Sequence, residues 1–417
     1  MVIGHLDFGY LLGIGIWLLG FFNVVMSKAQ FPMSESATNV VNSYIDEALR
    51  LSASDVHIEP DATHVRIRFR IDGTLREAGS EDMDFLPTIV SRIKVLSSLD
   101  ISETRIPQDG RFQIKKGGKE LDVRVSVFPT SYGECVVMRL LDLSRALLSF
   151  DQLGVRGNDA ERLQRMVSKP NGLLLATGPT GSGKTTSLFS FLNTITTPEK
   201  CVVTLEDPIE YRLPNIRQTQ VDYDIGLNFA KGLRGLFRQN PDIIMVGEIR
   251  DQETAQIAIE AALTGHLVLT TLHTNDAIGA VARLMNMGIE PFLIGSALIG
   301  VIAQRLVRKV CDVCGKEFHP PQTLLEDLGL PGTNMVFRRG EKCDACAFTG
   351  YRGRSGIFEV LEVTKEIETM IIAREPIEHI ETSARRSGMK SLRENGLSLA
   401  REGFTTLEEI VRLTRKS

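Results

Sequence analysis

Residues 178–185 read Gly178-Pro179-Thr180-Gly181-Ser182-Gly183-Lys184-Thr185, which matches the pattern G-x-x-x-x-G-K-[ST]. Glycines let such a loop wrap a phosphate with its backbone N–H groups, and the lysine reaches the β- and γ-phosphates. An apolar run at 173–177 precedes the loop and a helix-compatible run at 186–192 follows it, so the motif has the strand–loop–helix setting that it needs. A glycine-rich turn that binds nothing is the alternative, and this setting argues against it.

We therefore predict a nucleotide site for ATP and Mg²⁺, in which the Thr185 hydroxyl ligates the metal and the Lys184 ammonium contacts the phosphates. Lys184 is also a candidate catalytic residue, because phosphoryl transfer depends on neutralising the phosphate charge. The predicted binding residues are Gly178, Pro179, Thr180, Gly181, Ser182, Gly183, Lys184, Thr185 and Thr186.

Four short apolar runs between residues 155 and 305 alternate with helix-compatible segments. The runs are 173–177, 202–205, 243–246 and 267–271, and each stops at polar residues. Alternation of strands and helices favours an α/β fold, a parallel sheet with helices on both faces. Ligands of such sheets bind beyond the carboxyl ends of the strands, so the polar residues at these ends are candidates for the chemistry.

Glu248 follows the run 243–246, at the position of a Walker B motif. Gly247 stands where many such ATPases have the Mg²⁺-binding aspartate, so Glu248 is free to orient the attacking water. The alternative is a glutamate that caps a helix or pairs with a neighbouring charge, and Arg250 and Asp251 stand close by for that.

Glu206 ends the run 202–205 and is our candidate for positioning water or metal, whereas Asp207 and Glu210 fit turn and surface roles equally well. His266 and His273 lie seven residues apart and flank the run 267–271. A single histidine is usually structural, but this pair could sense the γ-phosphate or couple hydrolysis to motion. We therefore count both among the candidate catalytic residues.

Four of the six cysteines form two C-x-x-C pairs that are separated by 28 residues: Cys311, Cys314, Cys343 and Cys346. Zn²⁺ prefers four thiolates in tetrahedral coordination, and a closed S₄ set is structural rather than catalytic. A redox pair or free thiols are the alternatives. Cys135 and Cys201 fall on expected strands and fit small core residues.

Arginines recur on expected polar faces. Arg66, Arg68 and Arg70 share one face of an alternating segment, which we interpret as a solvated face. Two further pairs could contact phosphate through fixed guanidinium groups; they are Arg124 and Arg139 on expected strands, and Arg234 and Arg238 four apart on an expected helix.

The chain divides into four segments by pattern. Alternation at 65–71 followed by Asp72-Gly73 predicts a hairpin, within an α+β domain. The segments are an apolar N-terminal stretch at 1–33, the α+β domain at 34–141, a linker at 142–154 and the ATPase domain at 155–417. Within the last, we expect a zinc-binding element at 308–350 and helices at 356–417.

Charge and hydropathy restrict the partners. The formal net charge is −4 with no run rich in lysine or arginine, which argues against direct binding of nucleic acid. Residues 8–26 are uncharged and mostly apolar, at the short end for a membrane-spanning helix. A poorly defined or amphipathic start to the chain is the alternative.

At this point the sequence resembles the secretion and pilus-assembly ATPases of bacterial type II secretion and type IV pilus systems. The resemblance extends from about Ser34 to the C-terminus. It rests on the segments 54–60, 70–73, 106–111, 178–186, 206–210, 238–242, 247–251 and 264–276.

The resemblance implies a RecA-like P-loop ATPase core and a cytoplasmic homo-hexamer, peripheral to the inner membrane, that works with platform and docking proteins. It implies an acidic box at Glu206 and Asp207, catalytic Glu248 and a histidine box at His266 and His273. It also implies that the four arginines Arg124, Arg139, Arg234 and Arg238 reach toward the nucleotide.

The sequence departs from the family at its start, where the apolar run stands in place of an extra domain that docks on an inner-membrane partner. The sequence does not separate type II secretion from pilus assembly. A ring ATPase for DNA uptake or conjugation is the alternative function. A nucleotide-gated scaffold without hydrolysis is disfavoured, because Lys184 and Glu248 are both present.

Overall fold

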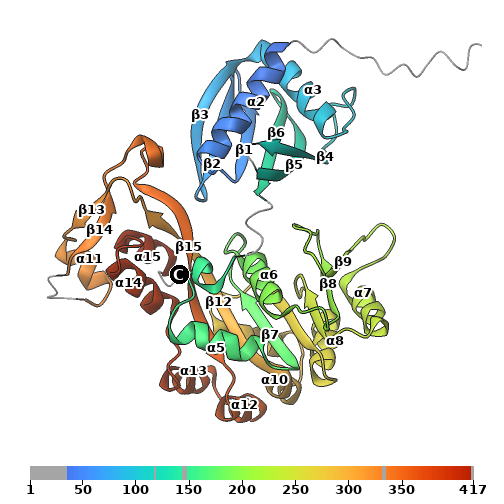
Figure 1. Ribbon diagram of the computed structural model, residues 1–417, viewed down its shortest axis with the longest axis vertical. Coiled ribbons are helices and arrows are strands. Elements are labelled where there is room, and N and C mark those ends of the chain that lie inside the picture. The colour runs from blue at the N-terminus through green and yellow to red at the C-terminus, as the bar shows by residue number, and fades with distance from the viewer. Residues whose placement is uncertain (1–34, 117–118, 143–147, 331–334, 415–417) are drawn as a thin grey trace, which may run out of the picture.

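The computed structural model describes residues 35–116, 119–142, 148–330 and 335–414 of the 417-residue chain. These residues form a smaller N-terminal domain and a larger domain, the predicted ATPase domain, that carries a cysteine-rich element (Figure 1). The apolar run at 8–26 lies outside the described residues. Within them, no helix is both long enough and apolar enough to cross a bilayer.

The N-terminal domain is an antiparallel sheet with two helices packed on one face. The strands are β1 (Asp55–Pro60), β2 (His64–Ile71), β3 (Thr74–Asp82), β4 (Gln108–Lys116), β5 (Lys119–Thr130) and β6 (Gly133–Asp142), in the spatial order β3-β2-β1-β6-β5-β4. The helices are α2 (Glu35–Arg50) and α3 (Leu86–Leu96), with a 3₁₀ turn at Met83–Phe85.

The alternation that predicted β2 decides which face is buried. Val65, Ile67 and Phe69 are at most 1% exposed and pack with α2 and α3, whereas the intervening arginines lie on the opposite face. Since side chains alternate across a strand, this pattern leaves a polar sheet face. The predicted hairpin at Asp72-Gly73 is confirmed between β2 and β3.

The ATPase domain is built on a seven-stranded sheet in the order β15-β12-β7-β11-β10-β8-β9. The strands are β7 (Gly172–Thr177), β8 (Val202–Glu206), β9 (Arg217–Gln220), β10 (Ile243–Val246), β11 (Leu267–Leu272), β12 (Leu298–Val310) and β15 (Tyr351–Glu362). Six strands are parallel and β15 runs antiparallel to β12. The predicted α/β fold is therefore confirmed, with an antiparallel edge strand that the pattern did not show.

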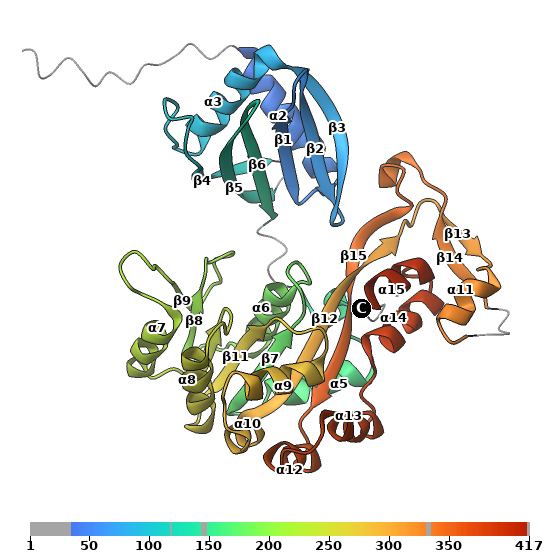
Figure 2. The same cartoon turned by 180° about the vertical axis from the view of Figure 1, so that it is seen from behind.

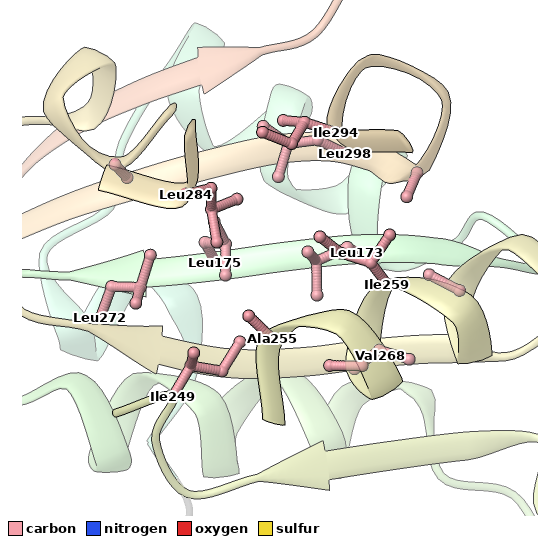
Figure 3. Packing of buried hydrophobic residues seen from close by; sticks show 14 of the residues in the cluster. Leu173, Leu175, Ile249, Ala255, Ile259, Val268, Leu272, Leu284, Ile294 and Leu298 are labelled. Carbon is pink, nitrogen blue, oxygen red and sulfur yellow. The ribbon is translucent and has the colours of Figure 1, made fainter. Parts of the chain in front are cut away.

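Helices cover both faces of this sheet, as predicted. One face carries α5 (Asn158–Val167) and α6 (Lys184–Ile195), and the short helix α4 (Phe150–Leu153) lies beside them. The other carries α7 (Phe229–Leu236), α8 (Gln252–Leu263), α9 (Ala277–Asn286) and α10 (Pro291–Ala297). Figure 3 shows this second core, where Leu173 and Leu175 of β7 meet residues such as Ile259 of α8 and Leu284 of α9. Burial on both faces explains why these strands read as continuous apolar runs.

The cysteine-rich element projects from the ends of β12 and β15 (Figure 2). It contains β13 (Gly315–Phe318), α11 (Gln322–Asp327), β14 (Phe337–Gly340) and a 3₁₀ turn at Asp344–Cys346. The helices that end the chain are α12 (Lys365–Ile372), α13 (Ile377–Arg386), α14 (Leu392–Arg401) and α15 (Leu407–Thr414).

The expectation of helices from residue 356 onward is wrong for its first part. Residues up to Glu362 belong to β15, and helices begin at Lys365. A short buried and mostly apolar run such as 357–361 fits a strand and a helix equally well by periodicity. The pairing with β12, which is remote in sequence, decides between them.

Candidate nucleotide site and candidate metal centre

The phosphate-binding loop joins β7 to α6, at the carboxyl end of a central strand. Gly178, Gly181 and Gly183 adopt positive φ angles of 145°, 77° and 89°, which side chains disfavour. A Cβ at Gly178 would lie 2.4 Å from the Gln304 carbonyl oxygen, so this close approach requires glycine. The buried Ser182 hydroxyl has no hydrogen-bond partner among the described residues, and a phosphate in the loop would supply one. The loop therefore fits the triphosphate that the motif predicts.

Lys184 is held inside this loop. Its Nζ donates to the carbonyl oxygens of Gly178 at 2.8 Å and Pro179 at 3.2 Å, and the residue is 8% exposed. Burial lowers the pKa of Lys184 below its usual value, while the nearby Glu248 carboxylate opposes that shift. The ammonium is thus poised over the loop and could exchange its carbonyl partners for phosphate oxygens.

Glu206 lies at the tip of β8 and is 3% exposed. Its Oε1 accepts hydrogen bonds from the Thr204 hydroxyl at 2.5 Å and from Gln218 Nε2 at 2.9 Å. Burial raises the pKa of Glu206, and these two hydrogen bonds oppose the rise. The carboxylate therefore has a fixed orientation on the cleft wall, as positioning water or metal requires.

Glu248 follows β10 and contacts both a cation and a histidine. It forms an ion pair with Arg250, which also lies 3.5 Å from Asp207. On its other side, His273 Nε2 lies 3.3 Å from Glu248 Oε2. The alternative interpretation, a salt-bridged glutamate, thus describes a real contact here, yet Glu248 also lines the cleft beside Lys184. Asp251 instead caps α8 by accepting from the Thr254 N–H at 2.8 Å.

A cleft of about 1050 Å³ lies between three parts of the molecule. Its walls include the loop from Thr180 to Thr186, the polar strand ends with Glu206, Glu248 and His273, and the arginine-bearing face of the N-terminal domain. Cys346 of the cysteine-rich element and Arg354 of the neighbouring strand β15 complete the lining. The nucleotide loop therefore faces a separate domain across this cleft.

Two of the four predicted arginines are near this cleft. Arg124 Nη2 donates to the carbonyl oxygen of Ile209 at 2.7 Å, which links the N-terminal domain to the loop after β8. Arg139 lines the cleft itself. By contrast, Arg234 pairs with Glu253 at 2.7 Å and Arg238 donates to the Arg234 carbonyl oxygen. Neither occurs among the cleft-lining residues of the described chain.

The two histidines lie at opposite ends of β11. His273 follows the carboxyl end, whereas His266 precedes the amino end and its Nδ1 lies 2.9 Å from the Ala261 carbonyl oxygen. Seven residue steps along extended chain place them roughly 23 Å apart, at about 3.3 Å per residue. The structure brings His273 to Glu248 and does not bring His266 there. The two histidines therefore do not share one site within a single chain. The role of His266 stays a prediction.

The four predicted cysteines converge from two chain segments. Their sulfurs all lie within 4.8 Å of one another, and neighbouring sulfurs are 3.8 to 3.9 Å apart. Tetrahedral coordination at a Zn–S distance near 2.3 Å implies a spacing of roughly 3.8 Å. Backbone N–H groups of Cys343 and Gly350 each lie 3.2 Å from Cys346 Sγ. The set therefore fits a closed tetrahedral metal site.

Residues 33–412 match the family model described as "Type II/IV secretion system protein". The chain belongs to this family. It is 46% identical over 378 residues to the type II secretion system protein E of Pseudomonas aeruginosa, covering 90% of this chain and 75% of that protein. It is 49% identical over 382 residues to the type IV pilus assembly ATPase PilB of Thermus thermophilus, covering 91% of this chain and 43% of that protein.

Solved structures agree with this placement in the secretion ATPase family. The pilus retraction motor PilT with bound ADP is 27% identical, with a TM-score of 0.62 over 89% of this chain and 96% of that one. The Legionella pneumophila ATPase DotB, 21% identical with a TM-score of 0.67, shows the same fold. This chain is accordingly an ATP hydrolase whose cofactors are ATP and Mg²⁺, and its four-cysteine cluster is compatible with zinc.

Sequence reasoning missed two features of this family member's site. Arg70, interpreted as solvated, lines the cleft together with Asp55. Gln304 of β12 is 1% exposed, and its Oε1 accepts from the Ser187 hydroxyl of α6 at 2.8 Å, next to the loop. The signal for Arg70 was its place at the end of β2 next to the hairpin, whereas Gln304 gave no local signal because β12 was not predicted.

Proposed function

We propose that the chain works as a homo-hexameric ATPase motor that drives assembly of a type II secretion pseudopilus or a type IV pilus. It would act at the inner membrane through the platform and docking proteins of that machine. The names of its relatives support both machines, since one is a type II secretion protein and another a pilus assembly ATPase. The observation that carries the motor is the cleft, which sets the phosphate-binding loop opposite the arginines of a separate domain.

In this proposal the loop residues 178–186 bind the triphosphate, and Lys184 moves from its carbonyl partners to the phosphates. Glu248 orients the attacking water, and His273 holds the Glu248 carboxylate from the side of β11. Glu206 and the Thr185 hydroxyl would hold Mg²⁺ or its water ligands. Bound Mg²⁺ supplies neutralising charge at the β- and γ-phosphates.

The N-terminal arginines couple hydrolysis to motion in this proposal. The γ-phosphate attracts Arg124 and Arg139 across the cleft and favours its closed form, and hydrolysis removes that attraction. Arg234, Arg238 and His266 lie away from this cleft, so they reach a nucleotide only if a neighbouring subunit of the ring brings its own cleft to them. Zn²⁺ held by the four cysteines would serve structure, since no ligand position is left open.

Placement at the membrane is part of the same proposal. The motor would lie on the cytoplasmic side, peripheral to the inner membrane, and residues 8–26 are a candidate anchor by composition. The net charge of −4 supports protein rather than nucleic acid as the partner.

Steady-state ATPase measurements on assembled full-length protein test the motor. Arg124→Ala and Arg139→Ala should each lower kcat about tenfold or more while ADP affinity falls only modestly. Arg66→Ala is the control, because this arginine lies on the same sheet but off the cleft and pairs with Asp61. Unchanged turnover in both Arg124→Ala and Arg139→Ala would contradict the coupling. Absence of any higher oligomer with an ATP analogue would contradict the ring, and strong stimulation by DNA would favour the DNA-translocating alternative.

A further inference from the structure

A row of charged side chains crosses the polar face of the N-terminal sheet. The strand register sets Arg70 of β2 beside Asp55 of β1, and Asp55 beside Arg139 of β6. Beyond them, Arg139 lies beside Arg124 of β5, which in turn lies beside Arg111 of β4. Like charges directly opposite each other destabilise a sheet. A row of four guanidinium groups with one carboxylate is therefore poorly explained by stability alone.

Asp55 is the one anion in this row, and it is 4% exposed. Its Oδ1 accepts from Arg139 Nε at 3.0 Å, and its Oδ2 lies 3.3 Å from Arg70 Nε and accepts from the Ser54 hydroxyl at 2.8 Å. Both arginines thus contact Asp55 through Nε, the nitrogen nearest the stem. Arg70 Nη1 also donates to the Gly73 carbonyl oxygen at 3.3 Å, whereas the Arg139 side chain remains 61% exposed.

The two arginines that Asp55 contacts both line the candidate nucleotide cleft. Asp55, Arg70 and Arg139 all belong to its wall, together with Lys184 and Thr185 of the loop. A long arginine side chain on an open face samples many rotamers, and a bond at Nε removes much of that freedom while leaving the fork available.

The geometry points to Asp55 as a positioning residue, which aims the guanidinium forks of Arg139 and Arg70 at the phosphates of a nucleotide on the loop. This inference rests on the proposed function, in which arginines of the N-terminal domain contact that nucleotide. Asp55 touches no substrate and acts only through its two partners. It gives a role to the segment 54–60, which otherwise has none in the nucleotide site.

A neighbouring pair supplies the matched control. Glu59 lies on the same strand and the same face as Asp55, and it pairs with Arg68 at 2.6 Å. Neither residue of this pair lines the cleft. If loss of a charge from the sheet lowers ATPase activity, Glu59→Gln should lower it as much as Asp55→Asn does. If the orientation of the arginines matters, only Asp55→Asn should lower it.

The test measures ATPase kinetics of the full chain under conditions in which the unmodified protein turns over. Asp55→Asn should lower kcat about tenfold, with less than about a threefold change in KM for ATP. Arg139→Lys keeps a positive charge but removes the Nε–H that Asp55 holds, so it should lower kcat by a similar factor. Combining the two should cost little beyond either, since both break one contact. Glu59→Gln should leave kcat unchanged.

Four results would overturn the inference: full activity of Asp55→Asn, full activity of Arg139→Lys, losses that multiply in the double variant, or an equal loss in Glu59→Gln. If Asp55→Asn fails to fold, Arg139→Lys still tests the inference, because the Arg139 side chain is exposed and its replacement should not disturb folding. Arg139→Ala distinguishes the contact of Arg139 with the nucleotide from the positioning of Arg139 by Asp55. If Arg139→Ala is fully active, the proposed contact of the arginine with nucleotide fails; if it is inactive while Asp55→Asn and Arg139→Lys are unaffected, only the positioning role of Asp55 fails.

Discussion

His273 Nε2 lies 3.3 Å from Glu248 Oε2, and this contact joins the carboxyl ends of β11 and β10 above the sheet. Glu248 also pairs with Arg250, which reaches toward Asp207 after β8. Charged and polar side chains thus link three neighbouring strand ends. A phosphate bound on the loop would compete with Glu248 for Arg250 and His273. The contacts of Glu248 should therefore differ between the empty and the nucleotide-bound site.

Replacing Glu248 separates nucleotide binding from hydrolysis. Glu248→Gln should retain ATP binding and lower kcat about 100-fold or more, the range in which proton-transfer and water-orienting groups contribute. Lys184→Ala should abolish binding instead, because it removes the phosphate contact. Glu260→Gln, an exposed carboxylate on α8, is the control for loss of a charge. ATPase activity at the unmodified rate in Glu248→Gln would show that another group orients the water.

His273 should matter through Glu248. His273→Ala should lower kcat roughly tenfold, less than Glu248→Gln, and should cost little in a chain that already carries Glu248→Gln. His266→Ala measured in parallel tests the predicted pair, since this histidine lies at the far end of β11. An equal loss in His266→Ala, seen only in assembled rings, would support action across subunits.

The buried carboxyl of Glu206 should make stability depend on pH. Burial raises the pKa of Glu206, so the stability that it contributes is fully present below the unfolded pKa of about 4.3 and is lost as pH rises through the raised folded value. Glu206→Gln should therefore melt higher than the unmodified protein near pH 7, with the difference shrinking toward pH 4, and should lose ATPase activity. Thermal melts across this range check it; a difference that does not vary with pH would contradict the assignment.

Metal removal should act on the C-terminal part of the ATPase domain. Purified protein should contain about one Zn²⁺ per chain, coordinated by four sulfurs in X-ray absorption. Cys343→Ser or strong chelation should unfold or expose residues 308–350 to protease, while ATP binding to the loop persists. Cys135→Ser is the matched control because this thiol lies in the N-terminal domain. A metal-free preparation with an unchanged protease pattern would rule the site out.

The apolar run at 8–26 predicts membrane association. The full chain should pellet with membranes and resist carbonate extraction, whereas a chain that starts at Ser34 should remain in the supernatant. Equal partitioning of the two forms would indicate that this run does not bind the membrane.

Local signals predicted most of the residues that the structure gathers at the candidate nucleotide site. Glycine spacing identified the loop, and the polar ends of apolar runs identified Glu206, Glu248 and His273 because parallel strands end at one edge. The clustering of the four cysteines followed from the two C-x-x-C pairs. These features share one property: the residues that form them are close in sequence or lie at equivalent strand ends.

What sequence could not supply depends on contacts between distant segments. The strand β15 is decided by pairing with β12, some fifty residues earlier, and so its last residues, 356–362, were assigned to helix. Arg70 has the same alternating pattern as Arg66, and only the placement of the two domains sets one on the cleft. His266 and His273 each lie directly next to β11 in sequence, so sequence alone treats them alike. In the structure they lie at opposite ends of this strand, and only His273 is at the edge that carries the site.

The long strand β12 runs from behind the loop to the cysteine-rich element. Gln304 of this strand bonds Ser187 behind the loop, and seven residues later the same strand delivers Cys311. At about 3.3 Å per residue, those seven residues make a stiff arm roughly 23 Å long. A rotation of the strand by about 5° at Gln304 would therefore displace the cysteine-rich element by about 2 Å. A small change next to the loop would thus become a larger movement at the far end of the strand.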